Sequence, residues 1–203
     1  MILLKIGVIS VQGAISEHVD AITSASLALG LRDVQVINVR KVEQLNNVNG
    51  LIIPGGESTT ISKLLIKFDL YDTILNRAAS EGLPILGTCA GCIMLATEGD
   101  SEVKKTNTKL LKLMDMAVDR NYFGRQRESF ESDIKINLPG FIDPFHAVFI
   151  RAPVIVRIWG KCKALSKLKS KIIFAQQDNL VAAAFHPELT NDLRIHKYFL
   201  GII

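Results

Sequence analysis

The chain has 203 residues and a mass of 22.4 kDa, which fits one domain with room for a sizeable core. An apolar content of 48%, a charged content of 22% and a mean hydropathy of +0.26 exclude disordered, collagen-like and low-complexity chains. Three cysteines exclude a disulfide scaffold and favour the cytoplasm. The longest uncharged run, residues 82–97, is too short and too interrupted to span a membrane, and no secretory signal is expected at the N-terminus.

The net charge of +4 is unevenly distributed. Residues 151–203 carry nine Lys and Arg against three Asp and Glu, and six of the nine lie between Arg157 and Lys171. This pattern is typical of a solvated loop and strand edge, or of a docking face for an acidic protein partner. Nucleic-acid binding is not expected, because the chain has only three Tyr and one Trp to interleave with basic residues.

Strand and helix patterns alternate through the first ninety residues. Apolar strands joined by helices predict a parallel sheet that is covered on both faces. The predicted strands are 5–11, 34–39, 50–54 and 84–88, and the predicted helices are 14–29, 58 to about 68, and 71–81.

The second half has short strand patterns with few helices between them, which indicates an antiparallel extension of the sheet. No linker or internal repeat divides the chain. We therefore expect a single domain over residues 1–203 with a three-layer α/β fold, built on a doubly wound and mostly parallel sheet. The later predicted strands are 135–136, 147–150, 154–158, 172–176 and 181–185, followed by a terminal helix at 191–200.

Two loops follow strands of the predicted parallel sheet, where doubly wound folds bind their ligands. Residues 54–60 read PGGESTT. Two glycines allow a sharp turn that directs N–H groups outward near a helix N-terminus, so the loop is either an anion or oxyanion site or an ordinary glycine-rich turn. Residues 87–92 read GTCAGC, and G-x-C-x-G after an apolar strand is the cysteine form of a nucleophile elbow.

Cys89 and Cys92 also form a C-x-x-C pair. Redox centres and half of a zinc site use this spacing, and a buried structural pair is a third possibility. No second C-x-x-C exists and Cys162 has no neighbouring cysteine in the sequence, so a metal site is not expected.

A cysteine nucleophile needs a base and a group that orients the base. His186 follows the predicted strand 181–185, and Glu188 stands two residues later. In an extended chain, residues two apart point to the same side, so the glutamate can reach one imidazole nitrogen while the other faces the sulfur. We expect the remaining histidines to be unrelated to the chemistry, with His18 at a surface or interface and His146 and His196 structural.

The elbow at 87–91 and the His-Pro-Glu at 186–188 resemble those of the triad glutaminases, the class I glutamine amidotransferases. Within them the chain is most similar to the glutaminase subunits of pyridoxal 5′-phosphate synthases, and the matching motifs cover nearly the whole chain. Cys92 and the stretch 100–115 depart from the family pattern. The matching motifs lie at residues 11–14 with 17–18, 54–60, 120–126, 149–153 and 185–190.

The resemblance implies a class I amidotransferase fold, which is flavodoxin-like, and a role for each matching residue. Cys89 would attack the amide of glutamine, His186 would be base and acid, and Glu188 would hold its tautomer. The backbone N–H groups of Gly56 and Ala90 would form the oxyanion hole. The residues that would hold glutamine are Gly56, Glu57, Ser58, Arg120, Ile150 and Arg151.

The resemblance also implies a partner and no cofactor. Such a subunit hydrolyses glutamine while docked on a (β/α)-barrel synthase and delivers ammonia to it, and it is expected to be nearly idle alone. No nucleic acid or membrane is implied. Two alternatives stay open, a glutaminase of another amidotransferase and a catalytically silent binding or redox module on the same fold.

Overall fold

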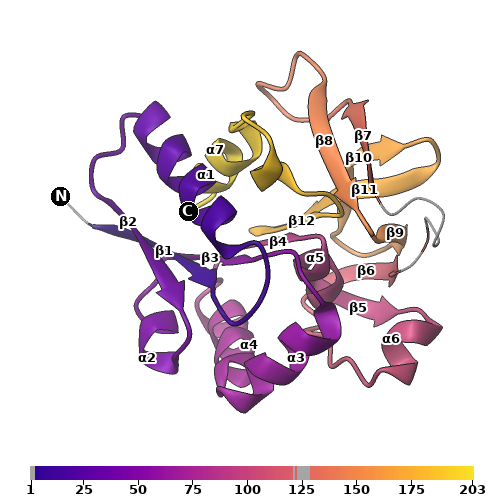
Figure 1. Ribbon diagram of the computed structural model, residues 1–203, viewed down its shortest axis with the longest axis horizontal. Coiled ribbons are helices and arrows are strands. Elements are labelled where there is room, and N and C mark those ends of the chain that lie inside the picture. The colour runs from indigo at the N-terminus through magenta and orange to yellow at the C-terminus, as the bar shows by residue number, and fades with distance from the viewer. Residues whose placement is uncertain (1–2, 121, 123–128) are drawn as a thin grey trace.

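A wide twisted sheet crosses the molecule, with helices packed on both of its faces (Figure 1). The computed structural model describes residues 3–120, 122 and 129–203. Within these residues the sheet has ten strands, in the order β2-β1-β3-β4-β12-β11-β9-β6-β5 with β10 paired to β11. The strands are β1 (Leu4–Ile9), β2 (Val34–Val39), β3 (Gly50–Ile53), β4 (Ile85–Thr88), β5 (Ala96–Gly99), β6 (Met114–Asp119), β9 (Val154–Ile158), β10 (Lys163–Leu168), β11 (Lys171–Gln177) and β12 (Leu180–Ala183).

The predicted parallel sheet is confirmed. Strands β2, β1, β3, β4 and β12 are parallel neighbours, and every residue of β3, β4 and β12 is buried. Strands covered on both faces need apolar side chains on both sides, which explains their continuous apolar sequences. The antiparallel extension is also confirmed, because β11 runs antiparallel to β12, β9 and β10, and β9 runs antiparallel to β6.

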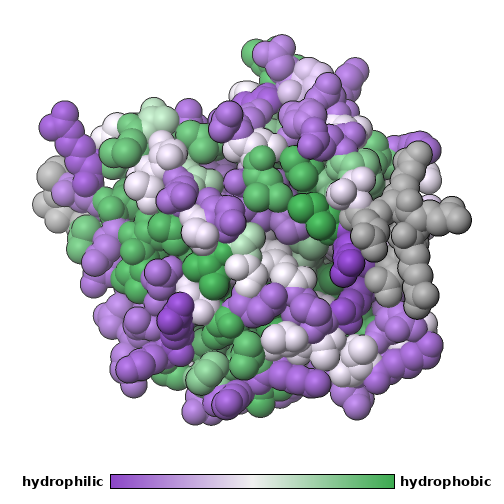
Figure 2. All heavy atoms as spheres, viewed as in Figure 1, coloured by the Kyte–Doolittle hydropathy of each residue, from purple (hydrophilic) through white to green (hydrophobic). Residues whose placement is uncertain are grey.

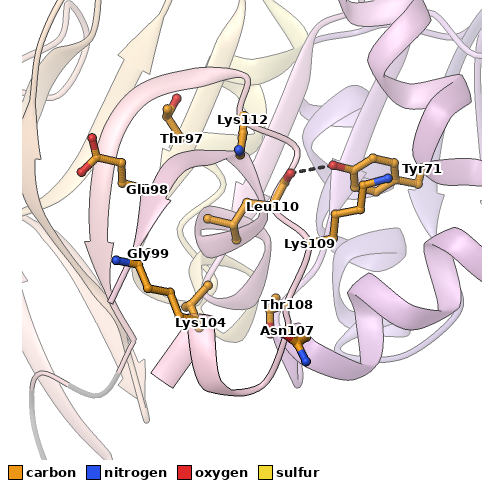
Figure 3. Close-up of a pocket in the computed structure, with 11 residues that line it drawn as sticks. Tyr71, Thr97, Glu98, Gly99, Lys104, Asn107, Thr108, Lys109, Leu110 and Lys112 are labelled. Atoms are coloured by element: carbon orange, nitrogen blue, oxygen red, sulfur yellow. Dashed lines mark hydrogen bonds between the residues drawn. The ribbon is translucent and has the colours of Figure 1, made fainter. Parts of the chain in front are cut away.

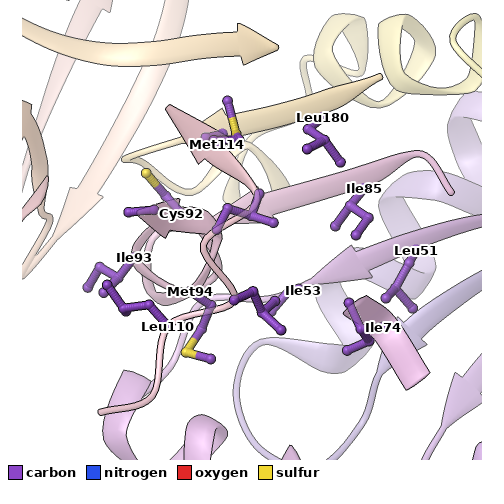
Figure 4. Packing of buried hydrophobic residues seen from close by; sticks show 14 of the residues in the cluster. Leu51, Ile53, Ile74, Ile85, Cys92, Ile93, Met94, Leu110, Met114 and Leu180 are labelled. Carbon is purple, nitrogen blue, oxygen red and sulfur yellow. The ribbon is translucent and has the colours of Figure 1, made fainter. Parts of the chain in front are cut away.

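The helices complete three layers and bury one apolar cluster on each face of the sheet. In Figure 1, α1 and α7 lie together on one face, and α3 and α4 lie on the other. Figure 4 shows part of the cluster that contains Met94 of α5 and Ile53 and Ile85 of the sheet. The helices are α1 (Ile15–Ala28), α2 (Val42–Leu45), α3 (Ser58–Lys67), α4 (Leu70–Ser80), α5 (Ala90–Leu95), α6 (Ser101–Lys105) and α7 (Arg194–Leu200).

Several elements of the second half were not predicted. The expected strand at 135–136 is wrong. The strand in this region ends just before it: β7 (Ser129–Ile134) pairs with β8 (Phe145–Ile150) as a separate two-stranded sheet. Strands β5, β6 and β10 and helix α6 were also missed. The face of the molecule shown in Figure 2 mixes hydrophilic and hydrophobic residues, as is usual for the surface of a folded protein.

Two glycines of the elbow let α5 pack directly on the sheet. A Cβ on Gly91 would lie 2.0 Å from the Ile53 carbonyl oxygen, and one on Gly87 would lie 2.5 Å from the Gly91 carbonyl oxygen. Only hydrogen in place of a side chain fits at these distances, so the backbones of β3, β4 and α5 touch here. This contact fixes where α5 begins and therefore where Cys89 stands.

Replacing Gly91 with alanine is expected to lower the free energy of unfolding by about 2 kcal/mol or more, because the new methyl meets backbone that cannot move cheaply. Gly201→Ala is the matched control. Gly201 follows α7 with right-handed backbone, and its nearest atom lies 3.4 Å from the added Cβ, so this change should stay within about 1 kcal/mol. Urea unfolding of both variants measures the difference. Equal stabilities would contradict the close packing of α5.

Candidate active site

The parallel pairing of β4 with β12 brings Cys89 and His186 to the same edge of the sheet. Thr88 is paired with Ala183, and the Cys89 N–H donates to the Ala183 carbonyl at 2.8 Å. Cys89 then has φ 48° and ψ −102°, a backbone conformation that non-glycine residues rarely adopt. A strained residue between a strand and a helix is the geometry of a nucleophile elbow. The expected elbow is therefore present.

His186 faces Cys89 with Glu188 behind it. The His186 Nδ1–H donates to Glu188 Oε1 at 2.6 Å, and both residues are 7% exposed. Burial lowers the pKa of His186, but hydrogen bonds with Cys89 and Glu188 outweigh burial and raise it to about 10. The site thus favours an imidazolium next to the sulfur. Such a pair is the reactive form of a cysteine nucleophile.

The chain does not stay extended after His186, as the sequence had suggested. Residues Pro187–Leu189 form a 3₁₀ turn, which begins with the proline and brings the Glu188 carboxylate back to the imidazole. The predicted contact between the two side chains is therefore present, but a turn makes it and an extended strand does not.

Gly55 packs against one side of the Cys89 and His186 side chains. A Cβ at Gly55 would lie 2.4 Å from His186 Cε1 and 3.2 Å from the Cys89 Cβ. The first glycine of the PGGESTT loop is thus required because imidazole and elbow both press against its Cα.

The loop at 54–57 is held from the other side by residues 12–14. The Ala14 N–H donates to the Gly55 carbonyl at 3.0 Å, and the Glu57 N–H donates to Gln12 Oε1 at 2.9 Å. Because a trans peptide points its C=O and N–H in opposite directions, the bond to Gly55 also sets the direction of the Gly56 N–H. Gly13 has φ 115° and lies so close to this carbonyl that a Cβ would be 1.9 Å from it.

Glu57 and Arg120, two of the predicted substrate residues, are already paired with each other. The Glu57 carboxylate caps α3 by accepting from the Thr59 and Thr60 N–H groups and the Thr60 hydroxyl. The Arg120 guanidinium donates to Glu57 Oε1, and to Thr59 Oγ1 at 3.0 Å. Burial raises the pKa of Glu57, but the Thr60 and Thr59 donors outweigh it and lower the pKa to about 2. Binding of a substrate carboxylate by Arg120 stays a prediction.

The remaining predicted substrate residues are Ser58, Ile150 and Arg151. The Ser58 hydroxyl is buried and has no hydrogen-bond partner among the described residues, which leaves it available to a ligand. The Ile150 carbonyl lies 3.8 Å from the Cys89 Sγ. Arg151 is exposed, with φ 44° at the end of β8. Asn121 and residues 123–126, part of one predicted motif, lie outside the described residues.

Cys92 is not positioned like Cys89. It is completely buried in the apolar cluster on one face of the sheet, where Figure 4 labels it beside Ile93 and Met114. Burial raises the pKa of the Cys92 thiol far above its usual range. A buried, protonated thiol is inert, so this arrangement favours a structural Cys92 over a redox partner of Cys89.

The prediction for His18 is wrong. The side chain is completely buried, and its ring nitrogens contact Thr88 and His196. His196 is buried as well, whereas His146 is half-exposed and lies between Asp133 and Glu131. His18 shares a helix face with Ile22 and Ala25, and this spacing was the signal that could have placed it inside.

A pocket of about 690 Å³ that does not include Cys89, His186 or Glu188 lies beside α6 and the segment that follows it (Figure 3). The Tyr71 hydroxyl donates to the Leu110 carbonyl at 2.6 Å, and the Lys109 ammonium lies over the tyrosine ring. None of the predicted site residues lines it.

Among the described residues, no helix is long and apolar enough to cross a membrane.

Comparison with protein families gives a match over residues 8–203 to a model described as the SNO glutamine amidotransferase family. Among curated proteins, the chain is 49% identical to "Pyridoxal 5'-phosphate synthase subunit PdxT" of Methanosarcina mazei, with 97% of each chain covered. It is also 49% identical to the protein of the same name from Pelotomaculum thermopropionicum, over 97% of this chain and 94% of the relative.

Solved structures agree with the observed fold. A crystal structure of a glutamine amidotransferase superposes with a TM-score of 0.83 at 40% identity, covering 97% of both chains. A second amidotransferase, from Thermotoga maritima, gives a TM-score of 0.64 at 13% identity over 97% of this chain and 81% of the other. The second likeness concerns the fold alone. The expected class I amidotransferase fold is confirmed.

The low pKa of Glu57 predicts a pH-dependent contribution to stability. Between pH 4.5 and about 2 the unfolded chain binds a proton at this residue that the folded chain does not, so its contribution is present above pH 4.5 and is lost as the pH falls through 2. The stability difference between the protein and Glu57→Gln should therefore shrink over that range. Thr60→Val, which removes one donor, should show the same trend more weakly. Urea unfolding at several pH values measures this, and parallel curves for protein and variant would contradict it.

Proposed function

The chain belongs to the SNO glutamine amidotransferase family, and on this premise we propose that it hydrolyses glutamine through a Cys89-His186-Glu188 triad for pyridoxal 5′-phosphate synthesis. The observation that carries the proposal is the strained Cys89 beside an imidazole that Glu188 holds at 2.6 Å. We further propose that residues 1–203 act as one glutaminase domain, which the single continuous main sheet supports.

The reaction follows from these positions. The Cys89 thiolate attacks the side-chain amide carbon of glutamine, and the carbonyl oxygen becomes an oxyanion. His186 gives its proton to the amide nitrogen, the C–N bond breaks, and ammonia leaves a thioester on Cys89. Water then attacks the thioester while His186 takes its proton, which releases glutamate and restores the thiolate–imidazolium pair. Glu188 keeps the Nδ1–H tautomer throughout.

The oxyanion is assigned to the N–H groups of Gly56 and Ala90. Ala90 is the first residue of α5, and the first N–H groups of a helix have no intrahelical acceptor. The hydrogen bond from the Ala14 N–H to the Gly55 carbonyl fixes the direction of the Gly56 N–H. Loss of one such donor costs about 10²- to 10³-fold in rate. The α-amino and α-carboxylate groups of glutamine are assigned to the surrounding polar groups, among them the side chains of Glu57, Ser58, Arg120 and Arg151 and the carbonyl of Ile150.

A synthase subunit is the proposed partner. The relatives are named as subunits of pyridoxal 5′-phosphate synthase, which supports a shared complex for this chain. We take the partner to be the (β/α)-barrel synthase that the sequence motifs imply. We take the compartment to be the cytoplasm, which the free cysteines support. Direct transfer between subunits keeps ammonia unprotonated and therefore nucleophilic.

Cys89→Ala and His186→Asn should each abolish ammonia release from glutamine, because one removes the nucleophile and the other removes the general base and acid. Both variants should still bind the synthase. Glutaminase assays with the partner present and a pull-down measure the two properties. Ammonia release that persists in Cys89→Ala would refute the proposed nucleophile.

A glutamine-like chloroketone should label Cys89 alone. Cys92 and Cys162 are internal controls, because burial raises the pKa of both thiols, that of Cys162 to about 11. Peptide mass spectrometry locates the adduct. A reversible Cys89–Cys92 disulfide without labelling would instead support the redox module.

The isolated chain should release ammonia slowly, and addition of the synthase should raise kcat by completing the oxyanion hole. Stimulation by the pyridoxal phosphate synthase, and not by the synthases of other amidotransferases, would identify the partner. A free subunit as fast as the complex would overturn this prediction.

A further inference from the structure

The Glu188 carboxylate has a second oxygen that the triad does not use. Oε1 accepts the His186 Nδ1–H, while Oε2 lies 3.4 Å from His18 Nε2, and both the Glu188 and the His18 side chains are completely buried. Among the described residues Oε2 has no conventional hydrogen-bond partner. A buried carboxylate oxygen needs a nearby donor, so the neighbouring imidazole decides how this carboxylate is held.

His18 also touches the residue that precedes the nucleophile. Its Nε2 lies 2.8 Å from the Thr88 hydroxyl, and its Nδ1 lies 3.2 Å from His196 Nε2. One side chain of α1 thus contacts the strand end before Cys89 and the turn that carries Glu188.

Hydrogen-bond accounting selects one tautomer. His196 Nδ1 is buried without a partner among the described residues. If His18 Nδ1 carried the proton, His196 Nε2 would have to accept a hydrogen bond from it. The proton of His196 would then be on Nδ1, a buried N–H with no acceptor. If His196 Nε2 carries the proton, it donates to His18 Nδ1, and of the four ring nitrogens only the bare His196 Nδ1 stays unpaired. The first arrangement would also turn the bare lone pair of His18 Nε2 toward Glu188 Oε2, 3.4 Å away, so the second arrangement is favoured.

In that arrangement the remaining His18 proton is on Nε2, directed at Thr88 and Glu188. Burial, together with electrostatic interactions with His196 and His186, lowers the pKa of His18 well below its usual value, so the ring is neutral and carries this single N–H. Burial likewise lowers the pKa of His196 to about 4.

We propose that His18 is a positioning residue that acts through Glu188: its Nε2–H, shared between the Thr88 hydroxyl and Glu188 Oε2, holds the carboxylate so that Oε1 faces His186. This role rests on the proposed triad and extends it inward to α1. His18 does not touch the substrate or the reacting atoms.

The test compares His18→Gln with His18→Asn. A glutamine amide reaches the place of Nε2 and keeps a donor near Glu188, whereas an asparagine amide reaches only the place of Nδ1 and faces His196. With the synthase present, His18→Asn should lower kcat about tenfold or more with KM nearly unchanged, because a hydrogen bond to a charged group is lost. His18→Gln should stay within about threefold of the parent. Ile22→Val, on the same buried face of α1, controls for packing.

The outcomes separate the possible roles. If kcat falls equally in both His18 variants and follows their melting temperatures, His18 is merely structural and the proposal is wrong. An unchanged kcat in His18→Asn would also overturn the proposal. If the parent itself fails to release ammonia with the synthase, the proposed function fails and not this inference alone.

A measurement on the unaltered protein keeps the proposal testable if a variant does not fold. Nitrogen NMR of labelled histidines should find His18 protonated at Nε2 and not at Nδ1, and should find the His186 Nδ1–H as a strongly downfield proton. The opposite His18 tautomer would overturn the proposal. In folded variants, the downfield signal should persist in His18→Gln and shift in His18→Asn.

Discussion

The pairing of β4 with β12 is the constraint on which the site depends. These strands are far apart in the sequence, yet Thr88 is opposite Ala183, so the chain leaves the sheet at Cys89 on one strand and near His186 on its neighbour. Adjacent parallel strands lie about 4.8 Å apart, which is close enough for a thiolate and an imidazole to meet once each strand has turned. Because β12 is inserted between β4 and the antiparallel strands, the extension of the sheet is what holds the base in place.

Close backbone contacts turn this pairing into a defined geometry. Gly91 lets α5 rest on β3, Gly55 lets the imidazole and the elbow approach the PGGESTT loop, and Gly13 lets the preceding loop reach the Gly55 carbonyl. Because each contact keeps the backbone from relaxing, the surrounding packing can hold Cys89 at its unfavourable φ. This backbone strain is confined to Cys89. The contacts that hold Cys89 in place come from the loops around Gly13 and Gly55, from the elbow itself and from α5 packed on the sheet.

The sequence predicts most of the parallel half and the meeting of Cys89, His186 and Glu188, because continuous apolar strands, helix-ending glycines and the motifs around Cys89 and His186 are local signals. It predicts the antiparallel half poorly. Strand β7 reads SFESDI and alternates between exposed and partly buried residues, so its polar composition hides a strand that only pairing with β8 defines. The turn at Pro187 and the burial of His18 depend on tertiary contacts. The helical spacing of His18, Ile22 and Ala25 was the local signal that could have shown which face of α1 is covered.

A neutral histidine behind Glu188 suits the chemistry better than a cation. An arginine or lysine at that place would form its own ion pair with the carboxylate and weaken the pull of Glu188 on the His186 imidazolium, which helps to raise the His186 pKa to about 10. An apolar side chain would leave Oε2 without any donor nearby. A buried imidazole that cannot hold a second proton avoids both problems, since it offers one N–H for orientation and no charge. The burial that makes His18 look like core is therefore what allows it to orient the carboxylate without neutralising it.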